Sequence, residues 1–219
     1  MAQETAPRTH GLVLNWAARY DILAWLLTHG REGELRKRIL TFADLRNGEA
    51  VLDIGCGTGT LAIAASRHVG TTGEVIGIDA SPSMVARANR KAGRAGARAA
   101  FQVAVAENLP FPDRRFDVVL STLMLHHLPR TTRQQCAREI TRVLKSGGRV
   151  LAVDFGRAKQ RGLLAHFHRH GHVEVQAIVT LLSDAGLEPI RSGQVGMNNL
   201  NFVLARTPPG ERPDPSANA

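Results

Sequence analysis

The chain is poor in aromatic residues and contains no long apolar run. Aromatic residues make up 5% of its 219 residues while 43% are hydrophobic, so we expect an aliphatic, alanine-rich core. No apolar stretch approaches the roughly 20 residues that a membrane-spanning helix needs. Residues 1–10 contain Glu4, Pro7 and Arg8 and no apolar segment, so we expect no secretory signal. The length fits a single domain with a sizeable core.

Cysteine is also scarce. The two cysteines, Cys56 and Cys136, lie far apart in the sequence and provide neither a disulfide framework nor the paired spacing of a zinc site. We therefore expect a reducing, cytoplasmic environment.

Acidic residues are outnumbered by basic ones. The chain has 28 Lys and Arg against 19 Asp and Glu, which gives a net charge of +9. Such an excess can indicate a nucleic-acid or anionic-surface partner. The basic residues are scattered from Arg31 to Arg133, however, and no run of them is interleaved with stacking aromatics. We interpret them as a solvated basic surface and expect no nucleic-acid partner.

The most informative stretch is Ala50–Thr60, which reads AVLDIGCGTGT. Val51, Leu52 and Ile54 are typical of a short strand buried on both faces. Three glycines at alternate positions then permit a tight turn and the close approach of a ligand to the backbone. From Leu61 the apolar pattern favours a helix. We predict a strand, a glycine loop and a helix whose N-terminus points at the loop.

This glycine loop differs from the common phosphate-binding loops. Its spacing is G-x-G-x-G rather than G-x-G-x-x-G, and no Lys-Ser or Lys-Thr pair follows it. Asp53 precedes the glycines, where a carboxylate would repel a pyrophosphate and favour a ligand that carries positive charge. The stretch resembles motif I of the class I S-adenosylmethionine-dependent methyltransferases, whose cofactor carries an amino group and a sulfonium.

Asp79 ends the next predicted strand, 73–79, about 20 residues beyond the glycine loop. An acidic side chain at this place can accept hydrogen bonds from both ribose hydroxyls of a nucleoside. Ser81 and Pro82 follow as the N-cap and first residue of a helix that we predict to about residue 92.

A third short strand, 101–103, leads into the segment 106–112, which reads AENLPFP. This segment resembles the D-A-E-x-L-P-F segment that borders the adenine ring in the same family. Val105 stands where that family has Asp or Asn, which removes the side-chain acceptor for the adenine amino group. Glu107 or the backbone must then supply the polar contacts.

Two further predicted strands, 116–121 and 149–155, bring polar residues to the same edge of the sheet. Ligands of open α/β sheets lie beyond the carboxyl ends of the strands. Residues 121–123 should therefore flank the cofactor, and His126 or His127 should face the substrate. A predicted helix over 131–144 separates these strands, and Asp154 lies at the end of the second one.

Segments on both sides of this core complete the predicted fold. Helices over 11–28 and 31–44 precede the glycine loop, and Tyr20-Asp21 resembles an N-terminal element of the quinone C-methyltransferases, in which such helices cover the active site. A helix over 173–185 and an antiparallel hairpin, 187–195 with 200–206, close the chain. The resemblance implies an α/β, Rossmann-like class I methyltransferase sheet of seven strands, with the last strand antiparallel, helices on both faces and an N-terminal helical cap.

We predict one methyltransferase domain over residues 11–206, between disordered tails at 1–10 and 207–219. Its predicted parts are a helical cap (11–46), a cofactor-binding core (47–155) and a substrate-side segment with the closing hairpin (156–206).

The same resemblance implies S-adenosyl-L-methionine as the cofactor. Asp53 would hold its amino-acid part, the loop amides would let it lie close to the backbone, and Asp79 would bind the ribose. The predicted cofactor-binding residues are Asp53, Gly55, Cys56, Gly57, Gly59, Asp79, Ala80, Met84, Ala106, Glu107, Ser121 and Thr122.

Methyl transfer from a sulfonium depends on positioning in a water-poor site and needs a base only when the acceptor must lose a proton. The candidate catalytic residues are His126, His127, Asp154 and Tyr20, of which histidine titrates near neutral pH. The alternative for the two histidines is structural, with one ring capping a turn and the other lining a pocket. The alternative for Asp154 is a solvated strand end.

Four histidines, at positions 166, 168, 170 and 172, form a separate cluster. No cysteine accompanies them, and Glu174 is the nearby carboxylate. We interpret the cluster as a solvated basic loop and predict no metal site.

We predict an S-adenosylmethionine-dependent methyltransferase, similar to the ubiquinone/menaquinone C-methyltransferase and methyltransferase type 11 group, that acts on a small apolar or aromatic molecule. Its positive charge leaves a nucleic-acid methyltransferase as one alternative, although residues 121–124 read Ser-Thr-Leu-Met rather than the Asn/Asp-Pro-Pro-Tyr loop that stacks a flipped base. Val105 leaves a non-catalytic binding module as the other. The oligomeric state stays open.

Overall fold

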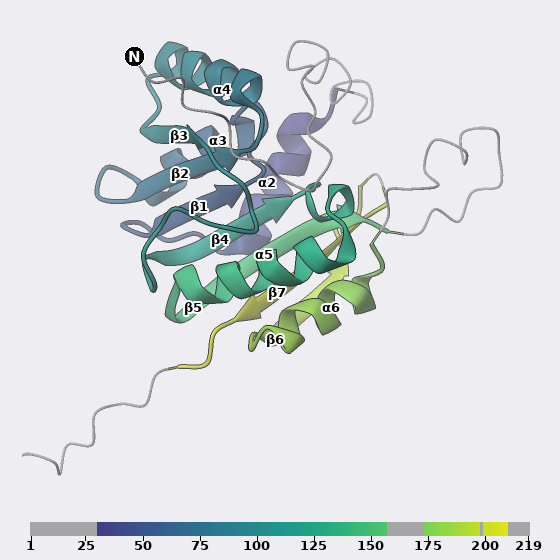
Figure 1. The fold of residues 1–219 in the computed structure, drawn as a ribbon. Coiled ribbons are helices and arrows are strands. Elements are labelled where there is room, and N and C mark those ends of the chain that lie inside the picture. Colours follow the sequence, from purple (N-terminus) through teal and green to yellow (C-terminus); the bar gives the residue numbers. More distant parts are fainter. Residues whose placement is uncertain (1–29, 157–172, 198, 210–219) are drawn as a thin grey trace, which may run out of the picture.

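The computed structural model describes residues 30–156, 173–197 and 199–209, which form helices around a twisted central sheet (Figure 1). Its strands are β1 (Ala50–Ile54), β2 (Glu74–Asp79), β3 (Ala99–Val103), β4 (Phe116–Thr122), β5 (Leu144–Phe155), β6 (Glu188–Gln194) and β7 (Leu200–Arg206). Its helices are α2 (Glu32–Ala43), α3 (Thr60–Val69), α4 (Pro82–Ala95), α5 (Arg130–Val143) and α6 (Val175–Asp184), with a 3₁₀ turn η1 (Leu125–His127).

The seven described strands form one sheet in the order β3-β2-β1-β4-β5-β7-β6. The neighbours from β3 to β5 pair in parallel, whereas β7 is antiparallel to both β5 and β6. This arrangement confirms the predicted seven-stranded sheet with an antiparallel last strand. The strand order reverses between β1 and β4, which is the place where open α/β sheets bind their ligands.

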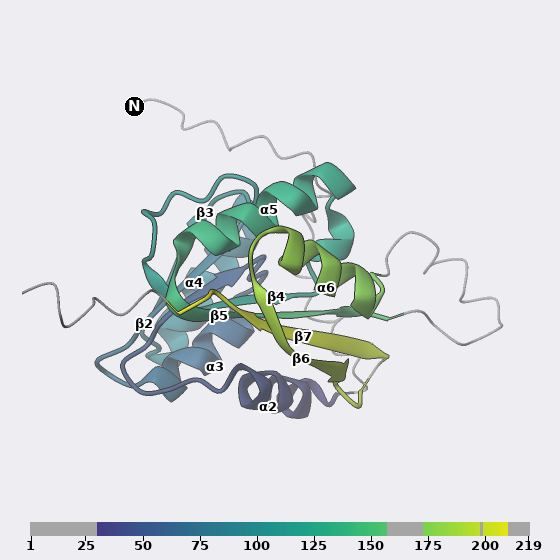
Figure 2. The same ribbon diagram turned by 90° about the horizontal axis from the view of Figure 1, so that it is seen from below.

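Alternate residues of each central strand pack on opposite faces of the sheet. Val51 of β1 packs with α2, α3 and α4, whereas its neighbour Leu52 packs with α5 and α6. Figure 2 shows α2 and α3 on one side of the sheet and α5 and α6 on the other. Consecutive apolar residues, such as Val51 and Leu52 of β1 and residues 118–120 of β4, follow from this arrangement, because both faces of these strands are covered.

The second of the two helices predicted before the glycine loop is confirmed as α2. Its end lies beside β5, where Arg149 Nε donates to the Ala43 carbonyl at 2.8 Å. Arg38, near the middle of the same helix, donates to the Val195 carbonyl beyond β6 at 3.1 Å. The helix therefore lies along the face of the sheet and belongs to the layer that contains α3. The predicted helix 11–28, with Tyr20, lies outside the described residues.

Two of the predicted boundaries that the structure shifts lie at β5 and just beyond β7. Strand β5 begins at Leu144 rather than at Arg149, because Leu144 pairs with Phe116 before a register shift in β4. Beyond β7, Thr207 is buried and its amide donates to the Gly148 carbonyl at 2.9 Å. The chain is thus held past the predicted boundary at residue 206, because the start of β5 offers carbonyl groups to it.

Across the described parts of the chain, we find no helix with the length and apolar character needed to span a membrane.

Candidate functional site

Polar side chains from four neighbouring strands meet at the carboxyl edge of the sheet. Asp53 lies near the end of β1, Asp79 ends β2, Ser121 and Thr122 end β4, and Asp154 lies near the end of β5. The registers align these ends, since Ile54 is paired with both Ile78 and Ser121, and Thr122 with Val153. The edge therefore combines the predicted cofactor residues with a predicted catalytic one.

The glycine loop is the tightest part of this edge. Gly55 and Gly59 have φ angles of 70° and 77°, in the left-handed region that favours glycine. A Cβ on Gly55 would lie 2.9 Å from the Cβ of Met124, and a Cβ on Gly59 would lie 2.6–2.8 Å from Phe101 and Ala88. The loop is thus pressed against its surroundings, and Gly59 stands directly before the first residue of α3. The other side of the glycine loop leaves backbone accessible to a ligand.

Asp79 fixes the shape of the loop from β2. Its Oδ2 accepts a hydrogen bond from the Gly57 amide and its Oδ1 from the Ser81 amide, both at 2.9 Å. Burial raises the pKa of the Asp79 carboxyl above its ordinary value. Each carboxylate oxygen has a second lone pair, so these two bonds leave Asp79 able to accept from a ligand hydroxyl.

Asp53 is a buried carboxylate of the site, with one oxygen unpartnered among the described residues. Its side chain is 2% exposed, and within the described residues its Oδ2 has no hydrogen-bond partner. Burial and, next, the neighbouring charge of Asp79 raise its pKa to about 7, although the Ala62 amide donates to it. A buried carboxylate in this condition is costly unless a cationic group pairs with it. The site therefore suits a ligand that brings a positive charge to Asp53.

Two hydroxyl groups at the end of β4 are also buried without a hydrogen-bond partner within the described residues. Ser121 Oγ and Thr122 Oγ1 are buried and have no hydrogen-bond partner within the parts of the chain that the structure describes. Buried polar groups without partners are rare in folded proteins and call for an explanation such as a ligand. Both residues are predicted cofactor neighbours, and they lie on the strand that pairs with β1.

The segment that follows β3 is clamped by helix α5. Glu139 accepts a hydrogen bond from the Leu109 amide at 2.7 Å, while Arg142 donates to the carbonyls of Leu109 at 3.0 Å and Phe111 at 2.8 Å. Glu139 and Arg142 are also bonded to each other at 2.8 Å. This pair fixes the backbone of the segment that includes Ala106 and Glu107. It thereby holds the predicted adenine side of the site without belonging to it.

The clearest chemical arrangement joins η1 to β5. His126 Nδ1 lies 2.7 Å from Asp154 Oδ1, and the His126 amide donates to Asp154 Oδ2 at 3.1 Å. Asp154 is fully buried and also accepts from the Phe155 amide at 2.8 Å, while the His126 side chain retains 10% exposure. A buried carboxylate thus orients a partly exposed imidazole. The predicted alternative of a solvated strand end does not apply to Asp154.

His127 lies against His126 but differs from it chemically. The two ring centroids are 3.9 Å apart. Burial, and next the neighbouring His126, lower the pKa of His127 to about 4, against a smaller opposing effect of Asp154. His127 is therefore neutral at physiological pH, and its ring packs beside the His126–Asp154 pair.

The other predicted cofactor residues lie around the same edge. Cys56 is buried within the glycine loop, and burial raises the pKa of its thiol well above the ordinary value, so the thiol is unreactive. Ala80 is half-buried directly after β2, Ala106 is buried, and Met84 is buried in the first turn of α4. Tyr20 and the histidines at 166–172 lie outside the described residues. Within those residues, we find no group of three His, Cys, Asp or Glu side chains that would hold a metal ion.

Sequence patterns did not reveal every residue that shapes the site. Met124 covers Gly55, and Glu139 with Arg142 clamps the segment after β3. The spacing of Glu139 and Arg142 suits a pair on one helix face. Their bonds to Leu109 join positions about 30 residues apart, and no local pattern encodes such contacts.

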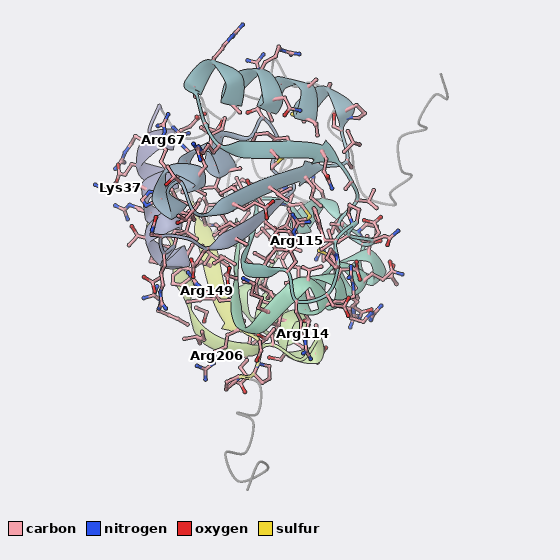
Figure 3. All side chains as sticks on the ribbon, turned by 90° about the vertical axis from the view of Figure 1, so that its left-hand side faces the viewer. Lys37, Arg67, Arg114, Arg115, Arg149 and Arg206 are labelled. Carbon is pink, nitrogen blue, oxygen red and sulfur yellow. The ribbon has the colours of Figure 1, made fainter. Side chains whose placement is uncertain are left out.

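The positive charge is spread over the surface rather than gathered at the site. Figure 3 labels basic residues on one side of the molecule that come from helices, strands and loops of different parts of the chain: Lys37, Arg67, Arg114, Arg115, Arg149 and Arg206. Three of these side chains pair with carboxylates, at 2.8–3.2 Å, in Arg115–Glu74, Arg149–Glu49 and Arg206–Glu188. Half of the labelled basic side chains are therefore compensated locally.

The residues at this edge fit S-adenosylmethionine. Asp53 offers a buried carboxylate oxygen to a cationic amino group, Asp79 offers lone pairs to hydroxyls, and the glycine loop leaves backbone accessible. The orphaned hydroxyls of Ser121 and Thr122 lie on the neighbouring strand. Bound there, the cofactor would supply a methyl group activated by the sulfonium.

Comparison with known proteins agrees with this geometry. Residues 51–148 match the methyltransferase domain family. Over 148 residues the chain is 36% identical to the ubiquinone/menaquinone biosynthesis C-methyltransferase UbiE of Azotobacter vinelandii, covering 64% of this chain and 56% of that protein. It is 37% identical to UbiE of Pseudomonas entomophila, covering 64% and 55%. The matched region thus spans little more than half the length of these curated relatives.

Solved structures share the fold at lower sequence identity. A SAM-dependent methyltransferase from Aquifex aeolicus superposes with a TM-score of 0.73 at 23% identity, covering 87% of this chain and 97% of that one. The [4+2]-cyclase SpnF superposes with a TM-score of 0.67 at 22% identity, covering 81% and 82%. Residues 51–148 therefore form a methyltransferase domain, and the chain has the fold of the class I S-adenosylmethionine-dependent methyltransferases.

Proposed function

We propose that this protein transfers a methyl group from S-adenosylmethionine to a small molecule. The observation that carries the proposal is Asp53, whose buried carboxylate oxygen has no hydrogen-bond partner within the described residues at the end of β1. The α-amino group of the cofactor would pair with this oxygen and relieve the cost of a buried negative charge. A neutral or anionic ligand would leave that cost in place.

The remaining cofactor contacts follow from the order of the strands. Asp79 would accept from the ribose hydroxyls, and the hydroxyls of Ser121 and Thr122 would bond to the amino-acid part. Ala106 and Glu107 would border the adenine, with the segment held in place by Glu139 and Arg142. Val105 is buried and offers no side-chain acceptor, so the adenine amino group would bond to Glu107 or to backbone.

The acceptor that we favour is a small aromatic molecule. The relatives named above act, by their names, in ubiquinone and menaquinone biosynthesis, and a quinone-like ring is compatible with the apolar side chains near η1. Met124 and Leu125 are buried there, and the ring of Phe155 meets that of His126 at 5.4 Å between centroids. The region of this chain beyond the matched segment would determine which molecule is accepted.

Two other functions deserve a test in the same experiment. The first is methylation of RNA, which the net charge of +9 favours, although Arg115 and Arg149 pair with carboxylates of this chain. The other function is a non-catalytic binding module, which Val105 favours; the resemblance in fold to the [4+2]-cyclase SpnF adds that a protein can keep this fold for a purpose other than methyl transfer.

A tritiated methyl-transfer screen separates these possibilities. Phenols, hydroquinones, amines and short RNAs are incubated with labelled S-adenosylmethionine, and calorimetry with S-adenosylhomocysteine is run in parallel. We expect binding of S-adenosylhomocysteine and label on a small aromatic acceptor. Label on RNA, with tight binding that weakens steeply with salt, would support the nucleic-acid alternative. Binding without transfer to any acceptor would support the non-catalytic module, and absence of binding would refute the proposal.

A further inference from the structure

We infer that His126 is the general base of the reaction and that Asp154 positions it, so that the acceptor is a phenol or hydroquinone that loses a proton during transfer. This inference rests on the proposed function and adds the chemical class of the acceptor to it. It is carried by the contact between η1 and the end of β5.

The geometry assigns the two ring nitrogens different tasks. Asp154 Oδ1 lies 2.7 Å from His126 Nδ1 and accepts a hydrogen bond from the Phe155 amide, so we assign it the role of acceptor toward the ring as well. Nδ1 then carries the proton, and Nε2 keeps its lone pair. Within the described residues no protein group bonds to Nε2, and the side chain retains 10% exposure. His126 thus holds an available base beside the edge where the cofactor is proposed to bind.

A purely structural role explains this arrangement less well. To cap the turn, Asp154 needs to accept from the His126 amide, and Oδ2 does so at 3.1 Å. The contact between Asp154 Oδ1 and the His126 ring is not needed for this cap. It fixes the orientation of the His126 side chain, which itself caps no helix or turn among the described residues. A carboxylate that orients an imidazole through Nδ1 is the arrangement by which a histidine is kept in the tautomer that accepts a proton at Nε2.

Three further side chains pack around the His126–Asp154 pair. His127 lies on η1 with its ring 3.9 Å from that of His126, and its lowered pKa keeps it uncharged. Arg133 of α5 donates from Nε to the Leu128 carbonyl at 2.8 Å, and its charge interacts with that of Asp154. Phe155 presents its ring edge to His126. The imidazole is thereby held between a carboxylate and two rings.

Some methyl acceptors need a general base, and others do not. A thioether or tertiary amine attacks a sulfonium with its own lone pair and has no proton to lose. A phenol O–H or a hydroquinone becomes a strong nucleophile when it is deprotonated. In the proposed step, Nε2 takes the hydroxyl proton and the electron pair left on the acceptor forms the new bond to the methyl carbon. The carbon–sulfur bond breaks with its electron pair on sulfur, and His126 later returns the proton to water.

A phenol reporter tests proton transfer without turnover. 4-Nitrophenol absorbs visible light when it is ionised, and it is titrated into protein saturated with S-adenosylhomocysteine. We expect binding to the wild-type protein to increase the ionised fraction, and His126→Gln to abolish the increase. His68→Gln, at an exposed histidine of α3, is the matched control and should behave as the wild type. Equal ionisation in wild type and His126→Gln, or no binding of the reporter at millimolar concentration, would overturn the inference.

Two further measurements separate positioning from stability. The ¹⁵N spectrum of the histidine rings should show the His126 proton on Nδ1 in the wild type and on Nε2 in Asp154→Asn; a proton on Nε2 in the wild type would contradict the inference. With the acceptor found in the screen, His126→Gln should lose about 10²–10⁴-fold in kcat while its affinity for S-adenosylhomocysteine stays within twofold. Retention of kcat within threefold would also overturn it. Failure of S-adenosylhomocysteine to bind to the wild type would instead refute the proposed function.

Discussion

Replacement of Asp53 by asparagine should stabilise the protein while it weakens the cofactor site. The carboxyl of Asp53 has its pKa raised from 3.8 to about 7, first because it is buried and second because Asp79 lies nearby. In the unfolded chain the same group ionises near its ordinary pKa. Between about pH 4 and pH 7 the folded protein therefore holds a proton that the unfolded chain has released, so this group lowers the stability as the pH rises.

The size of the effect follows from the shift. It amounts to roughly three pKa units, and each unit corresponds to about 1.4 kcal/mol, so the ionised carboxylate lowers the free energy of unfolding by about 4 kcal/mol above pH 7. Asparagine has nearly the same shape, keeps an acceptor for the Ala62 amide and carries no charge. The difference in the free energy of unfolding between Asp53→Asn and the wild type should thus increase by about 4 kcal/mol from pH 4 to pH 8.

Urea unfolding at pH 4, 6 and 8 measures this difference, with Asp184→Asn, at an exposed carboxylate that ends α6, as the control for the loss of one charge. Calorimetry at pH 8 should show that Asp53→Asn binds S-adenosylhomocysteine about 10–100-fold more weakly, because a charge-assisted hydrogen bond is lost. A stability difference that does not change with pH would refute the electrostatic reasoning. Unchanged affinity would refute the assignment of Asp53 to the amino group.

Two further substitutions test the surroundings of the site. Arg142→Met removes the donors to the carbonyls of Leu109 and Phe111, so the affinity of the variant for S-adenosylhomocysteine, measured by calorimetry, should fall about tenfold. Arg138→Met, on the exposed side of the same helix, is the control and should leave the affinity unchanged. Equal affinities of the two variants would show that the bonds from Arg142 to this segment do not matter for cofactor binding. Gly59→Ala should destabilise the protein by about 2–4 kcal/mol in urea unfolding, because it adds a clash to an unfavourable φ angle. Gly96→Ala, which has a positive φ and open space, should cost about 1–2 kcal/mol, and equal costs at both glycines would contradict the clash.

The sequence predicted the parts of the site that lie close together along the chain. Asp53 and the glycines follow one buried strand, and Asp79 ends the next one, so the parallel arrangement alone brings them to a common edge. The same reasoning brought Ser121 to that edge, because the apolar residues 118–120 of the fourth strand come directly before it.

Contacts between distant positions could not be predicted in this way. His126 and Asp154 were both candidates, but their bond joins positions 28 residues apart and depends on the 3₁₀ turn that begins at Leu125. The turn also decides that His126 rather than His127 faces the carboxylate. Nothing in the pattern of residues around position 124 indicates that Met124 covers Gly55. Such contacts depend on the packing of the whole sheet edge.

The central claim is that Asp53 and Asp79 bind opposite ends of S-adenosylmethionine at the carboxyl edge of β1 and β2. A crystal structure of the protein with S-adenosylhomocysteine tests it most directly. We predict the α-amino nitrogen at about 2.7–3.2 Å from Asp53 Oδ2, and the ribose hydroxyls at similar distances from Asp79. A ligand bound elsewhere, or bound here with neither carboxylate in contact, would contradict the claim.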